Sequence, residues 1–157
     1  MISRPFIILT FLVALMLHII PLPLWAIWLK PLWVVLVLIY WINKTPYQVG
    51  LFIAWMTGFC LDILNGTLLG EHALALTVVA FAAAKFQRRV RVNPLSSQLL
   101  HILFYLMLYQ AVLFLIQEVI GQPIRDWRFW LAPFTSMLLW PWLAALLYKF
   151  HRHPHAI

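Results

Sequence analysis

One carboxylate stands inside a mostly apolar run and is the first candidate for chemistry. Asp62 lies in segment 57–66. A charge at the centre of a membrane costs about 2.5 to 3.5 kcal/mol on insertion scales, so such a residue has a functional reason to be there. No second carboxylate follows within one helical turn, and a lone Asp is no acid and base pair. We therefore favour an inward Asp62 that bonds a neighbouring helix or the turn from Gly66 to Gly70, over a hydrated helix-end carboxylate or an intramembrane enzyme.

Small residues accompany Asp62 at a fixed spacing. They recur every four residues, which places them on one slowly drifting face of a helix. A ridge of small side chains lets another helix approach closely, and close packing drives helix association in lipid. We therefore expect this ridge to pack against another helix of the bundle or of a partner. Its members are Gly50, Ala54, Gly58, Asp62 and Gly66.

The remaining titratable residues give weaker signals. Glu71 and His72 follow Gly70 at the start of an expected helix, where an acidic side chain suits the positive end of the helix dipole. Isolated histidines such as His18 and His101 are more often packing residues than ligands. The tail histidines offer no fixed ligand set, so a designed metal site is disfavoured. They are His151, His153 and His155.

Motifs that carry catalysis are missing from the sequence. It contains no phosphate-binding Gly-rich loop, no nucleophile elbow, no paired Cys and no His–Glu zinc motif. The single cysteine, Cys60, lies in an apolar run and is interpreted as a small packing residue. We therefore expect a protein that is not an enzyme and that uses no cofactor or metal.

The composition indicates which solvent surrounds these residues. Of 157 residues, 65% are hydrophobic and 10% are charged, whereas a soluble domain carries about 25% charged residues. The surplus apolar surface must face lipid, and residues 1–157 are expected to form a single transmembrane domain. The net charge of +7 does not indicate nucleic-acid binding, because the basic residues flank apolar runs, where topology signals lie.

Six apolar segments predict an all-α bundle of six transmembrane helices. A span needs about 20 apolar residues, and segments 5–20, 47–64, 99–117 and 129–150 are long enough. The first is expected to be a retained span, because no small-residue cleavage site follows it. Segments 31–42 and 73–84 cover only about 18 Å each, so they borrow flanking residues or form broken or re-entrant elements. Pro31 is expected in the first helical turn, where its missing N–H needs no partner.

The basic residues predict that both termini are cytoplasmic. With six spans, eight of the eleven Lys and Arg residues fall on the side of the termini and three fall on the other side. Five spans would split the termini and are disfavoured. The densest basic segment is interpreted as a loop that sets topology or touches anionic lipid or a cytoplasmic partner. It contains Lys85, Arg88, Arg89 and Arg91. Tryptophans near span ends are expected to be interfacial anchors: Trp25, Trp28, Trp33, Trp41, Trp127, Trp130, Trp140 and Trp142.

Three segments resemble a known family when their order and spacing are taken together. The stretch from Gly58 through Asp62 and Gly66 to Leu69-Gly70 and Ala73-Leu74 is similar to the signature of the rod shape-determining protein MreD family. Lys30-Pro31-Leu32-Trp33, leading to Ile39-Tyr40-Trp41, and Leu139-Trp140-Pro141-Trp142-Leu143 agree with it. Length and six-span layout match as well, so the resemblance covers almost the whole chain.

The resemblance implies a non-enzymatic inner-membrane subunit of the elongasome, the machine that inserts peptidoglycan along the side wall of rod-shaped bacteria. The implied partners are the bitopic protein MreC and, through it, the elongasome transpeptidase, the RodA glycosyltransferase and MreB filaments. Expected partner surfaces are the small ridge and the aromatic faces of the second and sixth spans, which carry Pro31, Trp140 and Pro141. The family's bundle is also similar to S components of energy-coupling-factor transporters, so a small-molecule-binding transport subunit is the alternative function.

Overall fold

The computed structural model describes residues 4–92, 94–123 and 126–152. Apart from the connecting turns, the described residues form helices and contain no strand, which confirms the all-α prediction. The bounds are α1 Arg4–Ile19, η1 Leu24–Leu29, α2 Trp33–Lys44, α3 Leu51–Asn65, α4 Glu71–Val92, α5 Leu95–Val119, η2 Trp127–Trp130 and α6 Leu131–Arg152, where η marks a 3-10 helix.

The helices differ in their ability to cross a membrane. Two are long and apolar enough by length and composition: Leu95–Val119, and the continuous helical segment Trp127–Phe150. Helices α1, α2 and α3 are apolar but have fewer than 18 residues. Large apolar side chains of α1, α3, α5 and α6 are exposed on the surface of the bundle.

Helix α4 is longer than the sequence predicted. It has 22 residues, which is about 33 Å of helix, and it contains Lys85, Arg88, Arg89 and Arg91. The expected basic loop is therefore wrong: these residues lie on the last turns of a helix. The physical reason is that Lys, Arg and Gln are good helix formers, that basic side chains suit a helix C-terminus, and that no Gly or Pro interrupts the run before Pro94.

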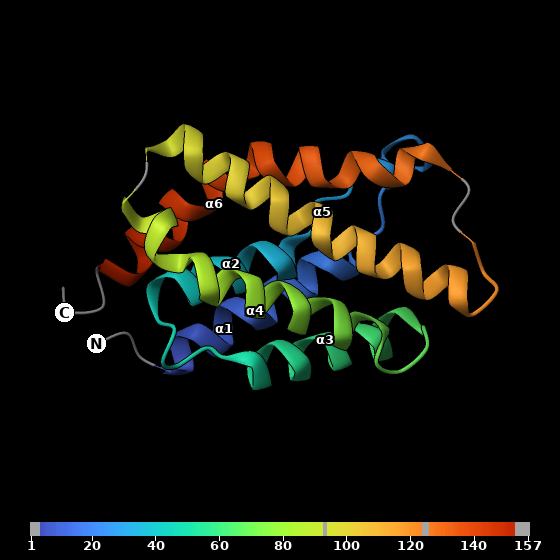
Figure 1. Cartoon of the computed structure of the whole chain (residues 1–157), viewed down its shortest axis with the longest axis horizontal. Helices are drawn as coiled ribbons and strands as arrows, with labels where there is room; N and C mark the ends of the chain where they lie inside the picture. Colours follow the sequence, from blue (N-terminus) through green and yellow to red (C-terminus); the bar gives the residue numbers. More distant parts are fainter. Residues whose placement is uncertain (1–3, 93, 124–125, 153–157) are drawn as a thin grey trace.

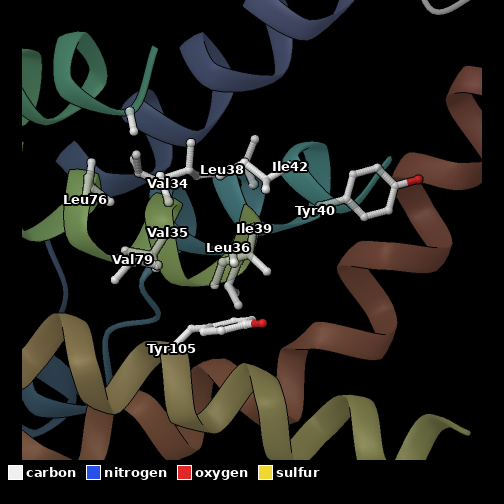
Figure 2. Packing of buried hydrophobic residues seen from close by; sticks show 14 of the residues in the cluster. Val34, Val35, Leu36, Leu38, Ile39, Tyr40, Ile42, Leu76, Val79 and Tyr105 are labelled. Atoms are coloured by element: carbon white, nitrogen blue, oxygen red, sulfur yellow. The ribbon is translucent and has the colours of Figure 1, made fainter. Parts of the chain in front are cut away.

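Helix α2 is the centre of the bundle. Ten of its twelve residues are buried, as expected for a helix that is apolar on every side. Figure 2 shows Leu76 and Val79 of α4 and the ring of Tyr105 of α5 around it, while Tyr40 points towards α6. Helices α1 and α6 also pack against α2. A 12-residue helix of about 18 Å is thus shielded by its neighbours.

Two of the expected interfacial tryptophans are core residues instead. Trp41 is fully buried, donates from Nε1 to Oγ1 of Thr10 at 2.8 Å, and lies edge-on to the ring of Phe6. Trp140 is also buried and lies 6.3 Å from the ring of Tyr40. The anchor interpretation of these two residues is wrong, because Trp41, on α2, packs against α1, and Trp140, on α6, packs against α2. Exposed tryptophans that keep the expected surface position are Trp25, Trp127 and Trp142.

The two prolines singled out in the sequence lie at different kinds of position. Pro31 precedes α2 rather than standing in its first turn, because the helix begins at Trp33 and the N–H of Leu32 donates to Ser136 of α6. Pro141 lies inside α6, where it removes an N–H from the helix. Helix α6 bends in its second half (Figure 1), which brings its residues around the central helix.

The chain ends of the bundle meet on one side. The start of α1 and the end of α6 lie at the same end of the molecule, and the turn between α3 and α4 lies at the opposite end (Figure 1). Helix α3 packs on α4, α4 packs on α5, and α5 packs on α6. The α3–α4 turn therefore belongs to the end of the bundle where α5 also finishes.

Candidate functional site

The carboxylate of Asp62 is fully buried and organises the α3–α4 turn. Its Oδ1 accepts hydrogen bonds from the backbone N–H and from Nδ1 of His72, both at 2.8 Å, and from Oγ1 of Thr67 at 3.2 Å. Its Oδ2 accepts from the N–H of Gly70 at 2.8 Å. We call Asp62, Thr67, Gly70 and His72 the Asp62 cluster. Within it, one side chain of α3 receives four donors from the turn and from the first turn of α4.

The Asp62 cluster acts as a cap supplied by a different helix. The first N–H groups of any α-helix lack partners inside the helix, and an Asp oxygen is among their best acceptors. Here the N–H groups of Gly70 and His72, at the start of α4, are both bound by Asp62. The negative carboxylate also lies at the positive end of the α4 dipole. The carboxylate thus fixes both the position and the direction of α4 relative to α3.

Glycines give the turn the shape that the cluster requires. Gly66 ends α3 in the left-handed region with φ of 66°, and Gly70 has φ of 105°. Both values are ones that glycine adopts at low cost. The N–H of Thr67 bonds the carbonyl of Asp62, and the N–H of Gly66 bonds the carbonyl of Ile63. The chain can therefore reverse within a few residues and return its donors to Asp62.

Gly58 is the closest point of approach between α3 and α4. A methyl group added at Gly58 would lie 2.6 Å from the backbone nitrogen of Ala73 and 2.6 Å from the carbonyl oxygen of His72. These are backbone atoms of α4, which cannot move aside as a flexible side chain can. Ala54, one turn earlier, is fully buried on the same side. The contact is the small-residue packing that brings two membrane helices together.

The predicted ridge is shorter than five residues. Ala54, Gly58 and Asp62 face the chain's own interior, whereas Gly50 and Gly66 are exposed at the two ends of α3 and a methyl group on either would meet nothing within 4 Å. Among the described residues nothing packs at the Cβ position of Gly50 or Gly66, so a packing role for them concerns a partner and stays a prediction. The physical reason is that α3 begins at Leu51 and ends at Asn65, so both glycines lie beyond the surface that α4 covers.

Further polar residues, weakly predicted by the sequence or not predicted at all, form hydrogen bonds at this end of the bundle. Glu71 is buried and accepts a hydrogen bond from the side-chain amide of Gln117 of α5. Nε2 of His18 and Oδ1 of Asn65 lie 3.0 Å apart and join α1 to α3. The sequence carried a signal for His72 and Thr67: a buried carboxylate needs donors, and both residues follow Asp62 within ten positions. Nothing in the sequence pointed to Gln117.

The segment between α1 and α2 is held against the end of α1 by a hydrogen bond from Lys30. Lys30 donates from its ammonium group to the backbone carbonyl of His18, at the end of α1. Burial lowers the pKa of this Lys30 ammonium below its ordinary value. The side chain of Lys30 thus caps the C-terminal end of α1, where carbonyl groups lack partners inside the helix.

The basic positions of α4 lie at the end that holds the start of α1 and the end of α6. Lys85, Arg88 and Arg89 are exposed, and the charged groups of Lys85 and Arg89 both lie 5.9 Å from the ring of Phe86. The side chains of Arg91 and His151, and the whole of His153 and His155, fall outside what the structure describes. The exposed charges form a basic surface at this end of the helix.

Among the hollows of the surface, two differ clearly in character. One is an apolar groove of about 460 Å³ whose walls are α1 and α6 and whose floor is α2; we call it the α1–α6 groove. Its lining includes Phe6, Leu9 and Val13 of α1, Val37 of α2, and Leu143 and Leu146 of α6. The other, of about 480 Å³, lies beside the α3–α4 turn and the end of α5, and we call it the Glu71 cavity.

Comparisons with known proteins agree with one another. The sequence model described as rod shape-determining protein MreD matches residues 2–150. The chain is also similar to the rod shape-determining protein MreD of Haemophilus influenzae, with 34% identity over 142 residues that cover 90% of this chain and 88% of that protein. No solved structure matches the chain, so the likeness to transporter S components stays a prediction. Because both matches extend over nearly the whole sequence, this protein belongs to the rod shape-determining protein MreD family, whose members are membrane-associated proteins that determine cell shape.

Proposed function

We propose that this protein is a non-enzymatic, multi-pass inner-membrane subunit of the side-wall peptidoglycan synthesis complex and is required for rod shape. The observation that carries the proposal is the match to the family over residues 2–150. The geometry supports a structural role, because the four donors on Asp62 all come from this chain. An acid or base would need a carboxylate that can reach a substrate proton.

The proposed topology is one transmembrane domain of six spans with both termini in the cytoplasm. It is supported by the common end of α1 and α6 (Figure 1) and by the exposed basic residues of α4 at that end. Helix α2 is short, but it lies inside the bundle and need not meet lipid at both ends. The positive-inside rule then puts the Asp62 cluster near the periplasmic surface.

The proposed partner is an MreC-type protein, and through it the elongasome transpeptidase, RodA and, indirectly, MreB filaments. The middle of the small ridge of α3, at Ala54, Gly58 and Asp62, and the face of α2 are covered by the chain's own helices, so they are not available to a partner. The α1–α6 groove remains open to the membrane, and its lining is apolar along about 16 Å of α1, from Phe6 to Leu17. We assign this groove to the single transmembrane helix of the bitopic partner, since close packing into a groove drives helix association in lipid.

Filling the α1–α6 groove is expected to weaken partner binding without unfolding the bundle. Leu9 lines the groove and is 55% exposed, whereas Leu12 is 52% exposed on α1 but does not line it. Leu9→Trp should lower the amount of MreC-type protein recovered per tagged bait about tenfold, because the indole occupies the space of the incoming helix. Leu12→Trp, the matched control, should stay within twofold of wild type. Equal recovery with both variants would remove the groove from the interface.

Identification of the partner tests the function itself. We expect tagged wild-type protein, solubilised from its own host, to bring down an MreC-type protein that mass spectrometry can identify. The alternative function, a small-molecule-binding subunit of a transporter, is favoured by one observation: the Glu71 cavity is partly polar and opens at the end opposite the termini. Recovery of an ATPase transport module in place of the MreC-type protein would establish that alternative and contradict the proposal.

A further inference from the structure

The Glu71 cavity contains a buried carboxylate that the described residues do not neutralise. Glu71 is 4% exposed and lines the cavity. Its Oε1 accepts from the amide of Gln117, whereas its Oε2 has no hydrogen-bond partner among the described residues. A carboxylate removed from water is costly unless it is paired or fully hydrogen-bonded. The dipole of α4 offsets part of that cost but supplies no donor to the second oxygen.

The surroundings make the cavity selective for a cation. The second buried carboxylate, Asp62, lies on α3 next to the adjoining turn, and among the described residues its ion-pair partner is His72. Among the described residues that line the cavity, none is Lys, Arg or His; they include Thr67, Leu68, Glu71, Gln117, Ile120 and Gln122. The lining thus offers one unpaired carboxylate oxygen, amide and hydroxyl groups, and two apolar side chains at the rim.

The shape and chemistry indicate which cation fits. A metal ion would need several ligands at once, and the described residues contain no group of three His, Cys, Asp or Glu side chains. The ammonium of a phospholipid is attached to a phosphate, which would approach two carboxylates with no basic residue in the lining to receive it. A Lys or Arg side chain has an aliphatic stem that can lie against Leu68 and Ile120. Oε2 of Glu71 is covered in the free protein, so the charge would meet it once the Glu71 side chain turns towards the cavity.

We propose that the Glu71 cavity binds the ammonium or guanidinium group of a Lys or Arg side chain supplied by a protein partner. A hydrogen bond between such a cation and Oε2 would complete the coordination of Glu71 and remove the uncompensated charge. Leu68 and Ile120 would form the apolar contact around it. The inference uses the proposed function only in that the partner is a protein of the same membrane.

A photo-crosslinker placed at the cavity tests this proposal in cells of the host. Benzoylphenylalanine at Leu68, which lines the cavity, is compared with the same group at Leu69, which is equally exposed but does not line it. We expect the Leu68 position alone to crosslink to a peptide that carries a Lys or Arg next to the attachment point. Glu71→Gln should reduce that yield at least tenfold, and Glu118→Gln, which changes an exposed carboxylate on α5, should leave it within twofold.

Every other outcome overturns the proposal. A phospholipid adduct in place of the peptide would assign the cavity to lipid. A peptide adduct that is indifferent to Glu71→Gln, an adduct without a basic residue, or no adduct would show that Glu71 does not recruit a basic side chain. Arg125 lies outside the described residues and is the chain's own candidate for the cation. Arg125→Ala must therefore leave the crosslinking yield within twofold. A larger change would show that the chain supplies its own cation. Glu71→Gln keeps the acceptor for Gln117, so its monodispersity after solubilisation checks folding, and cell shape after gene deletion separately tests the proposed function.

Discussion

Replacing Asp62 with Ala is expected to cost about 3 to 5 kcal/mol of stability, the range found when one partner is removed from a buried ion pair such as Asp62 and His72. The change leaves four donors without their acceptor: the N–H groups of Gly70 and His72, the ring of His72 and the hydroxyl of Thr67. Each unsatisfied buried group carries a desolvation cost of about 1 to 3 kcal/mol. The measurement is the midpoint of thermal unfolding of detergent-purified protein, followed by size exclusion.

Two variants separate the role of Asp62 from the general effect of removing an aspartate. Asp126 also caps a helix, since its carboxylate accepts from the N–H of Arg128, but it is exposed; Asp126→Ala should cost about 1 kcal/mol or less. Asp62→Asn keeps the shape but turns one acceptor oxygen into a donor that faces backbone N–H groups, so its loss should fall between those of the two alanine variants. A midpoint for Asp62→Ala equal to that of Asp126→Ala would contradict the structural role.

Adding one methyl group at Gly58 is the second change with a large expected effect. Gly58→Ala places a carbon 2.6 Å from backbone atoms of Ala73 and His72, so α3 and α4 must separate. Overpacking of this kind costs about 1 to 3 kcal/mol, which exceeds the gain of roughly 1 kcal/mol that Ala brings to a helix interior. Gly58→Leu should prevent a stable bundle. The unfolding midpoint and the yield of monodisperse protein measure both effects.

The control for Gly58 is another glycine of the same ridge. Gly50 has nothing within 4 Å of an added methyl group and a φ of −117°, which Ala adopts readily. Gly50→Ala is expected to change the unfolding free energy by no more than about 0.5 kcal/mol, the usual range for surface positions. If Gly58→Ala proves as stable as Gly50→Ala, the distance between α3 and α4 at Gly58 must be larger than the structure shows.

The fold could be predicted from the sequence where runs of apolar residues directly indicate which segments form helices. The apolar runs and their spacing predicted six helices, and the structure has six α-helices. The interpretation failed where burial depends on a neighbour. Trp41 stands near the end of an apolar run, as anchors do, but α2 lies inside the bundle and the ring of Trp41 packs against α1. Trp140, on α6, is buried against Tyr40 of α2. Nothing in a single sequence says which short helix is central.

The sequence predicted an inward Asp62 close to a turn, but it did not predict which residues donate hydrogen bonds to the carboxylate. A lone Asp in an apolar run had to find donors, and glycines at 66 and 70 indicated a tight turn nearby. The backbone path of that turn decides which donors reach Asp62. The sequence does not show this path, so it supported only a weak prediction for His72. Gln117 lies 46 residues after Glu71, and their bond exists only because α4 and α5 pack together. Long-range pairs of this kind leave no mark in local spacing.

The central claim is that this protein determines rod shape, and clean deletion of its gene in the host tests that claim most directly. The measurement is the ratio of cell length to width during exponential growth, with wild-type protein supplied from a second locus as the complementation control. We expect deleted cells to become round and the complemented cells to regain rods, whereas Asp62→Ala supplied in the same way should fail to restore them. Cells that remain normal rods after deletion would contradict the account.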